Sequence, residues 1–175
     1  MTAEELIARP DLEPCELIDG VVVPVMPSFR REGRIGARLG ARLNQWIEAG
    51  NRGHGFLGNV GIHIRRDPNT VRGADFIYAS HERYAQQGSS EYLDIAPELV
   101  AEVVGPEEGW CDLMAKLDDY FSIGVDRVWL VDAKGSRIFV YRSLTDVQQL
   151  GLGAALTDDD LLPGFRLSLS ELFRS

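Results

Sequence analysis

The sequence predicts an α/β domain built on a mixed β-sheet that is flanked by helices. Three observations support this fold class. Short apolar segments with strand character follow and precede amphipathic helical segments along the chain. A chain of 175 residues has the size of one domain and can bury a sizeable core. We find no internal repeat and no linker in it, so we expect residues 1–175 to form a single domain.

The composition is that of an ordinary globular protein, with 45% hydrophobic and 26% charged residues. No segment approaches the roughly 20 apolar residues of a membrane span, and the first residues lack the order of a signal peptide. Cys15 and Cys111 show no metal-ligand spacing. We therefore expect a cytoplasmic protein with no membrane association. The net charge of −9 argues against a strongly basic nucleic-acid binder, but an enzyme that gathers carboxylates around metal ions remains compatible with it.

The N-terminal part predicts a short helix and then a hairpin. Thr2 begins a capping-box pattern for a helix over residues 3–9. Residues 15–25 contain two apolar runs joined by an Asp-Gly pair, which is a favoured two-residue turn. Pro24 cannot donate to a neighbouring strand, so we expect the second strand to lie at an edge of the sheet.

Residues 31–49 have the apolar periodicity of an amphipathic helix. Glu32 projects onto the centre of its apolar stripe, one turn before Ile35. The helix dipole alone would favour a carboxylate in the first turn. Its inward direction supports a role in a site equally well.

A neighbouring face of the same helix carries four arginines within about 80° of arc: Arg31, Arg34, Arg38 and Arg42. The simpler interpretation is a solvated face. The alternative is a stripe that contacts the phosphates of a nucleic acid, because it is the one local basic patch in an acidic chain.

Two strands follow a Gly-rich turn over residues 51–58. Apolar residues alternate over residues 60–64, and an Asp-Pro-Asn turn leads into a second strand over residues 71–78. Asp75 lies in the middle of that strand. A strand-end carboxylate would be the structural explanation, but a fully buried lone aspartate is costly, so Asp75 is a candidate site residue.

The central unit of the chain is a strand over residues 99–104 followed by a helix over residues 108–123. Glu102 lies within the apolar strand and needs a partner if it is ionised. Lys116 lies at the border of the apolar stripe of the helix, so its long side chain can lift its ammonium to the end of the strand. Asp119 lies away from that stripe.

The remaining segments complete the sheet. Residues 127–132 predict a buried strand, and a turn leads to a strand over residues 137–141. We expect an edge strand over residues 147–152, an acidic loop over residues 157–162 and a terminal helix over residues 169–173.

The candidate residues Asp75, Glu102, Lys116 and Glu32 together suggest phosphodiester hydrolysis. Carboxylates bind hard divalent cations such as Mg²⁺ and leave room for several waters. Such a metal orients a phosphodiester and lowers the pKa of a bound water. A nearby lysine can position that water or neutralise charge in the transition state.

Five short motifs, in this order and spacing, resemble the Uma-two family, which is grouped with restriction endonucleases: ELIDG (16–20), VRGADF (71–76), PELVAEVVGPEE (97–108), KLDDYFSIGVDRVWLVD (116–132) and LLPGF (161–165). The resemblance implies a restriction-endonuclease-like fold with a PD-(D/E)xK nuclease core. It implies Asp75 and Glu102 as the acidic metal ligands and Glu32 as an additional acidic residue. The superfamily lysine would lie at Val104, so the resemblance assigns its role to Lys116.

The sequence departs from the family pattern at four positions. Ala74 replaces the usual proline, Gly105 a common serine, and Val21 a frequent acidic residue. Glu32 occupies a position that is often histidine, which would alter the metal preference. The charged residues of the proposed centre are intact.

The leading hypothesis is therefore a Mg²⁺-dependent DNA endonuclease, with Mn²⁺ as a possible substitute. One alternative is a non-catalytic module that keeps the nuclease fold for binding or assembly. Another is a metal-dependent hydrolase of a different phosphate ester. The low basicity favours the two alternatives, whereas Asp75, Glu102 and Lys116 favour the enzyme. Since nucleases of this superfamily often dimerise to cut both strands, we also expect a symmetric homodimer.

Overall fold

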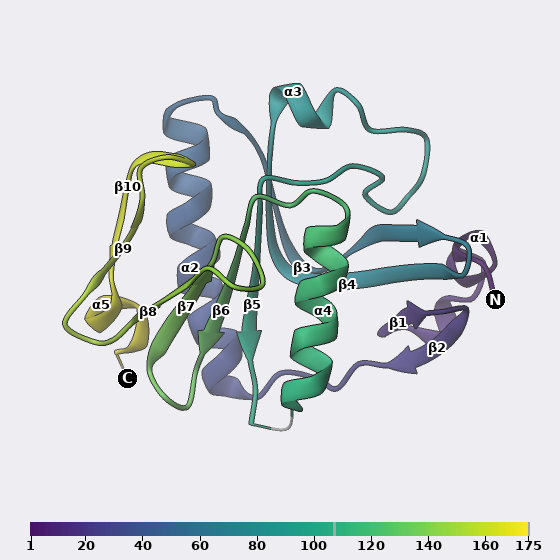
Figure 1. Ribbon diagram of the computed structural model, residues 1–175, viewed down its shortest axis with the longest axis horizontal. Helices are drawn as coiled ribbons and strands as arrows, with labels where there is room; N and C mark the ends of the chain where they lie inside the picture. The colour runs from purple at the N-terminus through teal and green to yellow at the C-terminus, as the bar shows by residue number, and fades with distance from the viewer. Residues whose placement is uncertain (107, 175) are drawn as a thin grey trace.

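The computed structural model describes residues 1–106 and 108–174, and its main element is an eight-stranded mixed sheet (Figure 1). The strand order is β2-β1-β4-β5-β6-β7-β8, and β3 pairs with β4 outside this path. Only β5 and β6 pair in parallel among these neighbours. The strands are β1 (Cys15–Ile18), β2 (Val21–Pro24), β3 (Gly53–Arg66), β4 (Asn69–Ser80), β5 (Leu99–Val104), β6 (Arg127–Asp132), β7 (Arg137–Tyr141) and β8 (Val147–Leu150).

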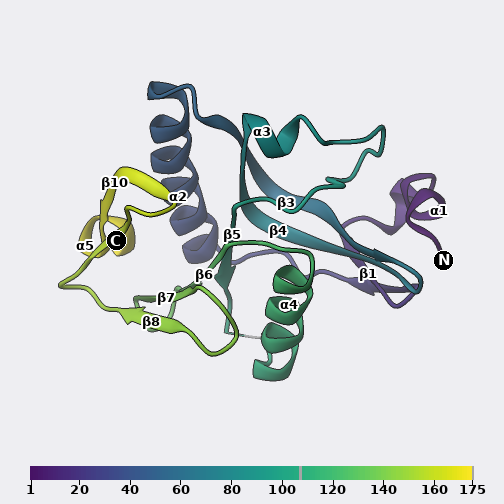
Figure 2. The ribbon, with the colours of Figure 1, turned by 45° about the horizontal axis from the view of Figure 1, so that its top comes forward.

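Two long helices cover opposite faces of the sheet, α2 (Arg30–Ala49) and α4 (Trp110–Ser122), as Figure 2 shows. The alternation along β5 explains this layering. Leu99 and Ala101 pack in the core beneath α2, whereas Val100 packs with Leu117 of α4. The shorter helices are α1 (Ala3–Ile7), η1 (Pro10–Leu12), α3 (His81–Tyr84) and α5 (Leu169–Phe173). The α/β fold class with a mixed sheet flanked by helices is therefore confirmed.

The N-terminal hairpin forms as the sequence predicts. β1 and β2 pair antiparallel, and β2 lies at the edge of the sheet. Asp19 and Gly20 form the turn with φ values of 51° and 78°, in the left-handed region that this turn requires. Thr2 makes both hydrogen bonds of the expected capping box.

β3 is longer than the sequence suggests. The expected Gly-rich turn over residues 51–58 is wrong for most of its length, because the strand already begins at Gly53. β3 forms a long hairpin with β4, and a register shift interrupts their pairing between Leu57 and Val60. Gly58 and Asn59 have positive φ values at this shift, so glycine and asparagine mark an irregularity within a strand rather than a loop.

The C-terminal segment adds a second, two-stranded sheet, β9 (Ala155–Asp158) and β10 (Leu162–Ser168). The acidic loop expected over residues 157–162 is therefore partly wrong. Asp158 is buried because it pairs with Arg127 at 2.8 Å, so an acidic residue here marks an internal ion pair.

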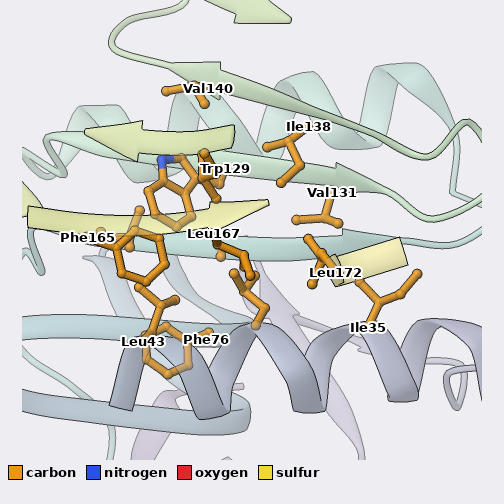
Figure 3. Close-up of a cluster of buried hydrophobic side chains, with 14 of the residues drawn as sticks. Ile35, Leu43, Phe76, Trp129, Val131, Ile138, Val140, Phe165, Leu167 and Leu172 are labelled. Atoms are coloured by element: carbon orange, nitrogen blue, oxygen red, sulfur yellow. The ribbon is translucent and has the colours of Figure 1, made fainter. Parts of the chain in front are cut away.

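This C-terminal segment covers the core on the α2 side (Figure 3). Phe165 lies against Trp129 with ring centroids 5.9 Å apart, and Leu172 packs in the same cluster as Ile35 of α2. None of the helices in the described parts of the chain is both long and apolar enough to cross a membrane.

Candidate active site

The candidate site lies at a fork in the sheet, where β4 changes its pairing partner. β3 pairs with one edge of β4 from Asn69 to Ser80. On the other edge, β4 pairs with β1 at Val71 and with β5 from Phe76 onward. Residues 72–75 therefore face a gap between β1 and β5, and no strand is in place to pair with their backbone groups there.

Three side chains satisfy backbone groups at this fork. Glu16 of β1 accepts a hydrogen bond from the backbone N–H of Gly73 at 2.9 Å, and the hydroxyl of Tyr120 lies 3.1 Å from the carbonyl of Gly73. Asp75 accepts a hydrogen bond through Oδ2 from the backbone N–H of Val103 at 2.7 Å. The missing ladder bonds thus explain why these polar side chains turn into the sheet.

Lys116 connects carboxylates from two different strands. Its Nζ lies 3.1 Å from Oε1 of Glu16 and 3.1 Å from Oε1 of Glu102. Glu102 is only 5% exposed and also accepts a hydrogen bond from the hydroxyl of Tyr120 at 2.6 Å. The ammonium has three N–H donors, so one remains for a water or a substrate oxygen. Lys116 therefore reaches the strand end from α4, as its position on the helical wheel suggests.

A chain of alternating charges runs from Glu16 to the surface. Arg72 pairs with Glu16 at 3.0 Å and with Asp119 at 2.7 Å. Asp119 also pairs with Arg65 at 2.8 Å, and Arg65 pairs with the exposed Asp19 at 2.7 Å. Asp119 lies away from the apolar stripe of its helix, yet it is buried because it faces Arg72 rather than solvent.

Burial and neighbouring charges act in opposite directions on these groups. Burial raises the pKa of Glu102 to about 8; Lys116 opposes this and Asp75 adds to it. Burial also acts on Glu16, but Lys116 and Arg72 outweigh it and hold the pKa of Glu16 below its ordinary value. Burial opposes the charge of Lys116, but Glu102 and Glu16 raise its pKa above the ordinary value. Lys116 is therefore an ammonium at neutral pH, and Glu102 holds a proton more tightly than a free carboxyl does.

Asp75 and Glu102 lie opposite each other on β4 and β5, beside the fork. The β4–β5 register puts them one position beyond the paired residues Phe76 and Ala101. Oδ1 of Asp75 and Oε2 of Glu102 have no hydrogen-bond partner among the described residues. Burial raises the pKa of Asp75, although a backbone amide and Lys116 act against it. Each carboxylate therefore keeps an oxygen that a cation can use.

Glu32 lies on the first turn of α2, on the other side of the sheet. Gly36, one turn later, is so close to β5 that an added Cβ would lie 3.7 Å from Cγ2 of Val103. Helix geometry therefore places Glu32 near the end of β5. Glu32 is 7% exposed, and its Oε2 is buried without a hydrogen-bond partner in the described part of the chain. Such an oxygen is costly unless a cation or a proton satisfies it.

The expected group of three carboxylates around one ion does not form as such. Within residues 1–106 and 108–174, no three His, Cys, Asp or Glu side chains are arranged to hold a metal ion. The structure therefore brings Asp75 and Glu102 together with Lys116, and it leaves Glu32 outside this group.

The arginine face of α2 is partly used within the chain. Arg38 donates hydrogen bonds to backbone carbonyls at the end of α5, and Arg42 pairs with a glutamate of α5 at 3.7 Å. Arg31 donates to the hydroxyl of Ser136 at 2.9 Å. Arg34 is exposed, with no ion pair or hydrogen bond among the described residues. Arg31 and Arg34 are therefore the two that make no contact with α5 among the described residues, and DNA contact by this face stays a prediction.

The residues that complete the fork were not among the site residues predicted from the sequence: Glu16, Arg72, Asp119 and Tyr120. Glu16 carries the same signal that marks Asp75 and Glu102, a carboxylate within an apolar strand. The spacing of Tyr120 assigns it to the apolar stripe of α4. Periodicity does not show where its hydroxyl points, so its role at the fork could not be predicted.

The raised pKa of Glu102 predicts a pH-dependent stability. The folded protein binds this proton more tightly than the unfolded chain, whose ordinary pKa is 4.5. The contribution of Glu102 to the free energy of unfolding is therefore fully present below pH 4.5. It is lost as the pH rises toward about 8, by about 1.4 kcal/mol for each pKa unit. Urea unfolding in the presence of a chelator should show this decline for the wild type relative to Glu102→Gln. If the free energy of unfolding changed with pH in the same way for both proteins, the raised pKa of Glu102 would be contradicted.

The arginine face gives a second prediction. If Arg31 and Arg34 contact phosphates, replacing both with alanine should weaken DNA binding equally for all sequences and lower the salt-dependence slope by about two. Arg38→Ala should instead lower the melting temperature, because Arg38 binds the end of α5. Fluorescence anisotropy at several salt concentrations measures the first effect. An unchanged slope would favour the solvated-face interpretation.

Comparison with known proteins agrees with this architecture. A family model for Uma2, described as "Putative restriction endonuclease", matches residues 3–170. No curated protein matches the sequence. Among solved structures, the fold is similar to the crystal structure of "a putative nuclease belonging to DUF820" from Anabaena variabilis ATCC 29413, with a TM-score of 0.84 and 18% identity over 99% of this chain and 97% of that chain. At this identity the structural likeness shows the fold alone. The family match extends over nearly the whole sequence, and the chain thus belongs to the Uma2 family of restriction-endonuclease-like proteins.

Proposed function

We propose that this protein is a divalent-metal-dependent endonuclease that hydrolyses DNA phosphodiester bonds at the fork. The observation that supports the proposal is the proximity of Asp75, Glu102 and Lys116 at the fork. Membership of the Uma2 family and the nuclease-like fold support it.

Negative charge exceeds positive charge around the fork. Four carboxylates surround two cations, which leaves two negative charges when all are ionised: Glu16, Asp75, Glu102 and Asp119 against Arg72 and Lys116. The outer pair of Arg65 and Asp19 is neutral and does not change this balance. A divalent cation would supply the missing charge.

The free oxygens of Asp75 and Glu102 fit a hard cation. Mg²⁺ commonly binds to one or two carboxylates and keeps several waters, so a group of three protein ligands is not required. Mn²⁺ accepts the same oxygen donors. When bound, such an ion would polarise a phosphoryl oxygen and lower the pKa of a water. Glu32 lies outside this pair of ligands, and its unsatisfied oxygen is not needed for such a centre.

Lys116 would act as a fixed positive charge. Its raised pKa excludes a role as general base at neutral pH. Glu16 and Glu102 hold its ammonium in place, and its remaining N–H can donate to the attacking water or to a phosphate oxygen. A fixed donor of this kind stabilises the negative charge that develops in the transition state.

Plasmid nicking tests the proposed function. We expect the wild type to convert supercoiled DNA to open circles with Mg²⁺ or Mn²⁺, and to stop when EDTA is added. Asp75→Ala should abolish nicking, whereas Asp118→Ala, on the exposed side of α4, should not. No cleavage by the wild type across varied DNA and RNA substrates would favour a non-catalytic module instead.

Lys116 gives a separate test. Lys116→Ala should lower the single-turnover cleavage rate by about 10²–10³, the effect of losing one preorganised electrostatic group. Lys116→Arg should rescue poorly, because a planar guanidinium cannot replace a compact ammonium between two carboxylates. The chain has one other lysine, the exposed Lys134, so Lys134→Ala is the matched control. Equal rates for wild type and Lys116→Ala at saturating metal would remove Lys116 from the mechanism.

A further inference from the structure

We infer that Glu16 is a positioning residue that keeps the Lys116 ammonium at the fork when Glu102 turns to a cation. The inference rests on the proposed function, because it concerns the same site. It assigns to the carboxylate of the ELIDG segment a role distinct from that of the two proposed metal ligands.

Glu16 has donors for both of its oxygens. Oε1 accepts from the backbone N–H of Gly73 at 2.9 Å and lies 3.1 Å from Nζ of Lys116. Oε2 accepts from Arg72 at 3.0 Å. The side chain is buried, and these donors hold it as a carboxylate. Glu16 therefore serves as an anchor rather than a metal ligand.

Glu102 cannot hold Lys116 equally well while it binds a cation. The ammonium and the ion would compete for the negative charge of one carboxylate, and they would also repel each other. The lysine side chain is flexible and 16% exposed, so an ammonium without a second partner would move toward solvent. Glu16 therefore remains as the partner of the Lys116 ammonium, because Glu16 does not bind the ion.

The anchor itself is fixed to the sheet. Arg72 holds Glu16 from one side, and Asp119 holds Arg72 through a hydrogen bond of 2.7 Å. The backbone of Gly73 holds Glu16 from the other side. These contacts belong to β1, β4 and α4, so the position of the ammonium is set by regular secondary structure rather than by a loop.

The small number of lysines permits a direct test. With ¹⁵N-lysine labelling, only Lys116 and Lys134 can give side-chain ammonium signals in NMR spectra, and Lys134→Arg assigns them. The measured quantity is the hydrogen-exchange rate of the Lys116 ammonium without metal. Glu102→Gln keeps this side chain uncharged at every pH, as a bound cation would neutralise it, and leaves Glu16 intact.

We expect the Lys116 ammonium to stay protected in the wild type and in Glu102→Gln. In Glu16→Gln its exchange should be faster by about tenfold or more, as expected for losing a charge-assisted hydrogen bond. Protection in Glu16→Gln equal to that in the wild type would overturn the inference, as would loss of protection in Glu102→Gln. Circular dichroism and thermal melting establish that each variant folds. If Glu16→Gln does not fold, Glu16→Asp replaces it, since aspartate keeps the charge on a shorter side chain. Unchanged protection of the Lys116 ammonium in Glu16→Asp would then overturn the inference.

A second arm separates this inference from the proposed function. Calorimetric titration with Mg²⁺ measures binding to the wild type, and the NMR signal is recorded again at saturation. The Lys116 signal should persist in the wild type and broaden beyond detection in Glu16→Gln. Absence of Mg²⁺ binding to the wild type would contradict the proposed function, whereas the metal-free comparison would still decide whether Glu16 is the anchor. Asp118→Asn is the matched control, because Asp118 lies on the exposed side of the same helix, and the Lys116 ammonium of this variant should stay protected.

Discussion

The change of partner along β4 is the constraint on which the candidate site depends. One edge of β4 is occupied by β3, and the other is divided between β1 and β5, so on this second edge no strand of the described chain pairs with the backbone around Gly73. Buried backbone groups must find partners. Glu16, Asp75 and Tyr120 provide them, and the same requirement places two carboxylates beside Glu102. The requirements of the fold and those of the proposed chemistry therefore coincide at these positions.

The choice between lysine and arginine follows the same geometry. Only two of the 18 basic residues are lysines. Arginine serves the longer connections, as in Arg72, whose planar guanidinium contacts Glu16 and Asp119 through different nitrogens. Lys116 instead lies where two carboxylates, one from β1 and one from β5, approach one atom across the fork. A compact ammonium fits this position, and two carboxyl groups rather than one offset its desolvation.

Much of the fold follows from local sequence, because strand and helix periodicity are strong in residues 99–123 and the turn at residues 19–20 is specific. The early start of β3 and the β9–β10 pair could not be predicted from the sequence. Glycines in the first segment and acidic residues in the second are typical of loops, but pairing with another strand keeps both segments extended. Among the candidate site residues, Asp75, Glu102 and Lys116 could be proposed from the sequence because a buried carboxylate requires a partner. The same rule applies to Glu16. The ion pair between Arg72 of β4 and Asp119 of α4 forms only in the packed structure. Helical and strand periodicity therefore could not predict it.

The fork also has a consequence for how the chain acquires its chemistry during synthesis. Glu16 and Lys116 lie far apart in the sequence yet meet in the site, and β4 and β5 lie between them along the chain. Because a protein is made from its N-terminus, the carboxylates of β1, β4 and β5 emerge before the helix that carries their counter-charge. A nascent chain that ends before α4 already contains Arg72 as a partner for Glu16, but it lacks Lys116 and Tyr120, which are the side-chain partners of Glu102. The carboxylates of the fork can therefore acquire all of their contacts only after α4 has been made.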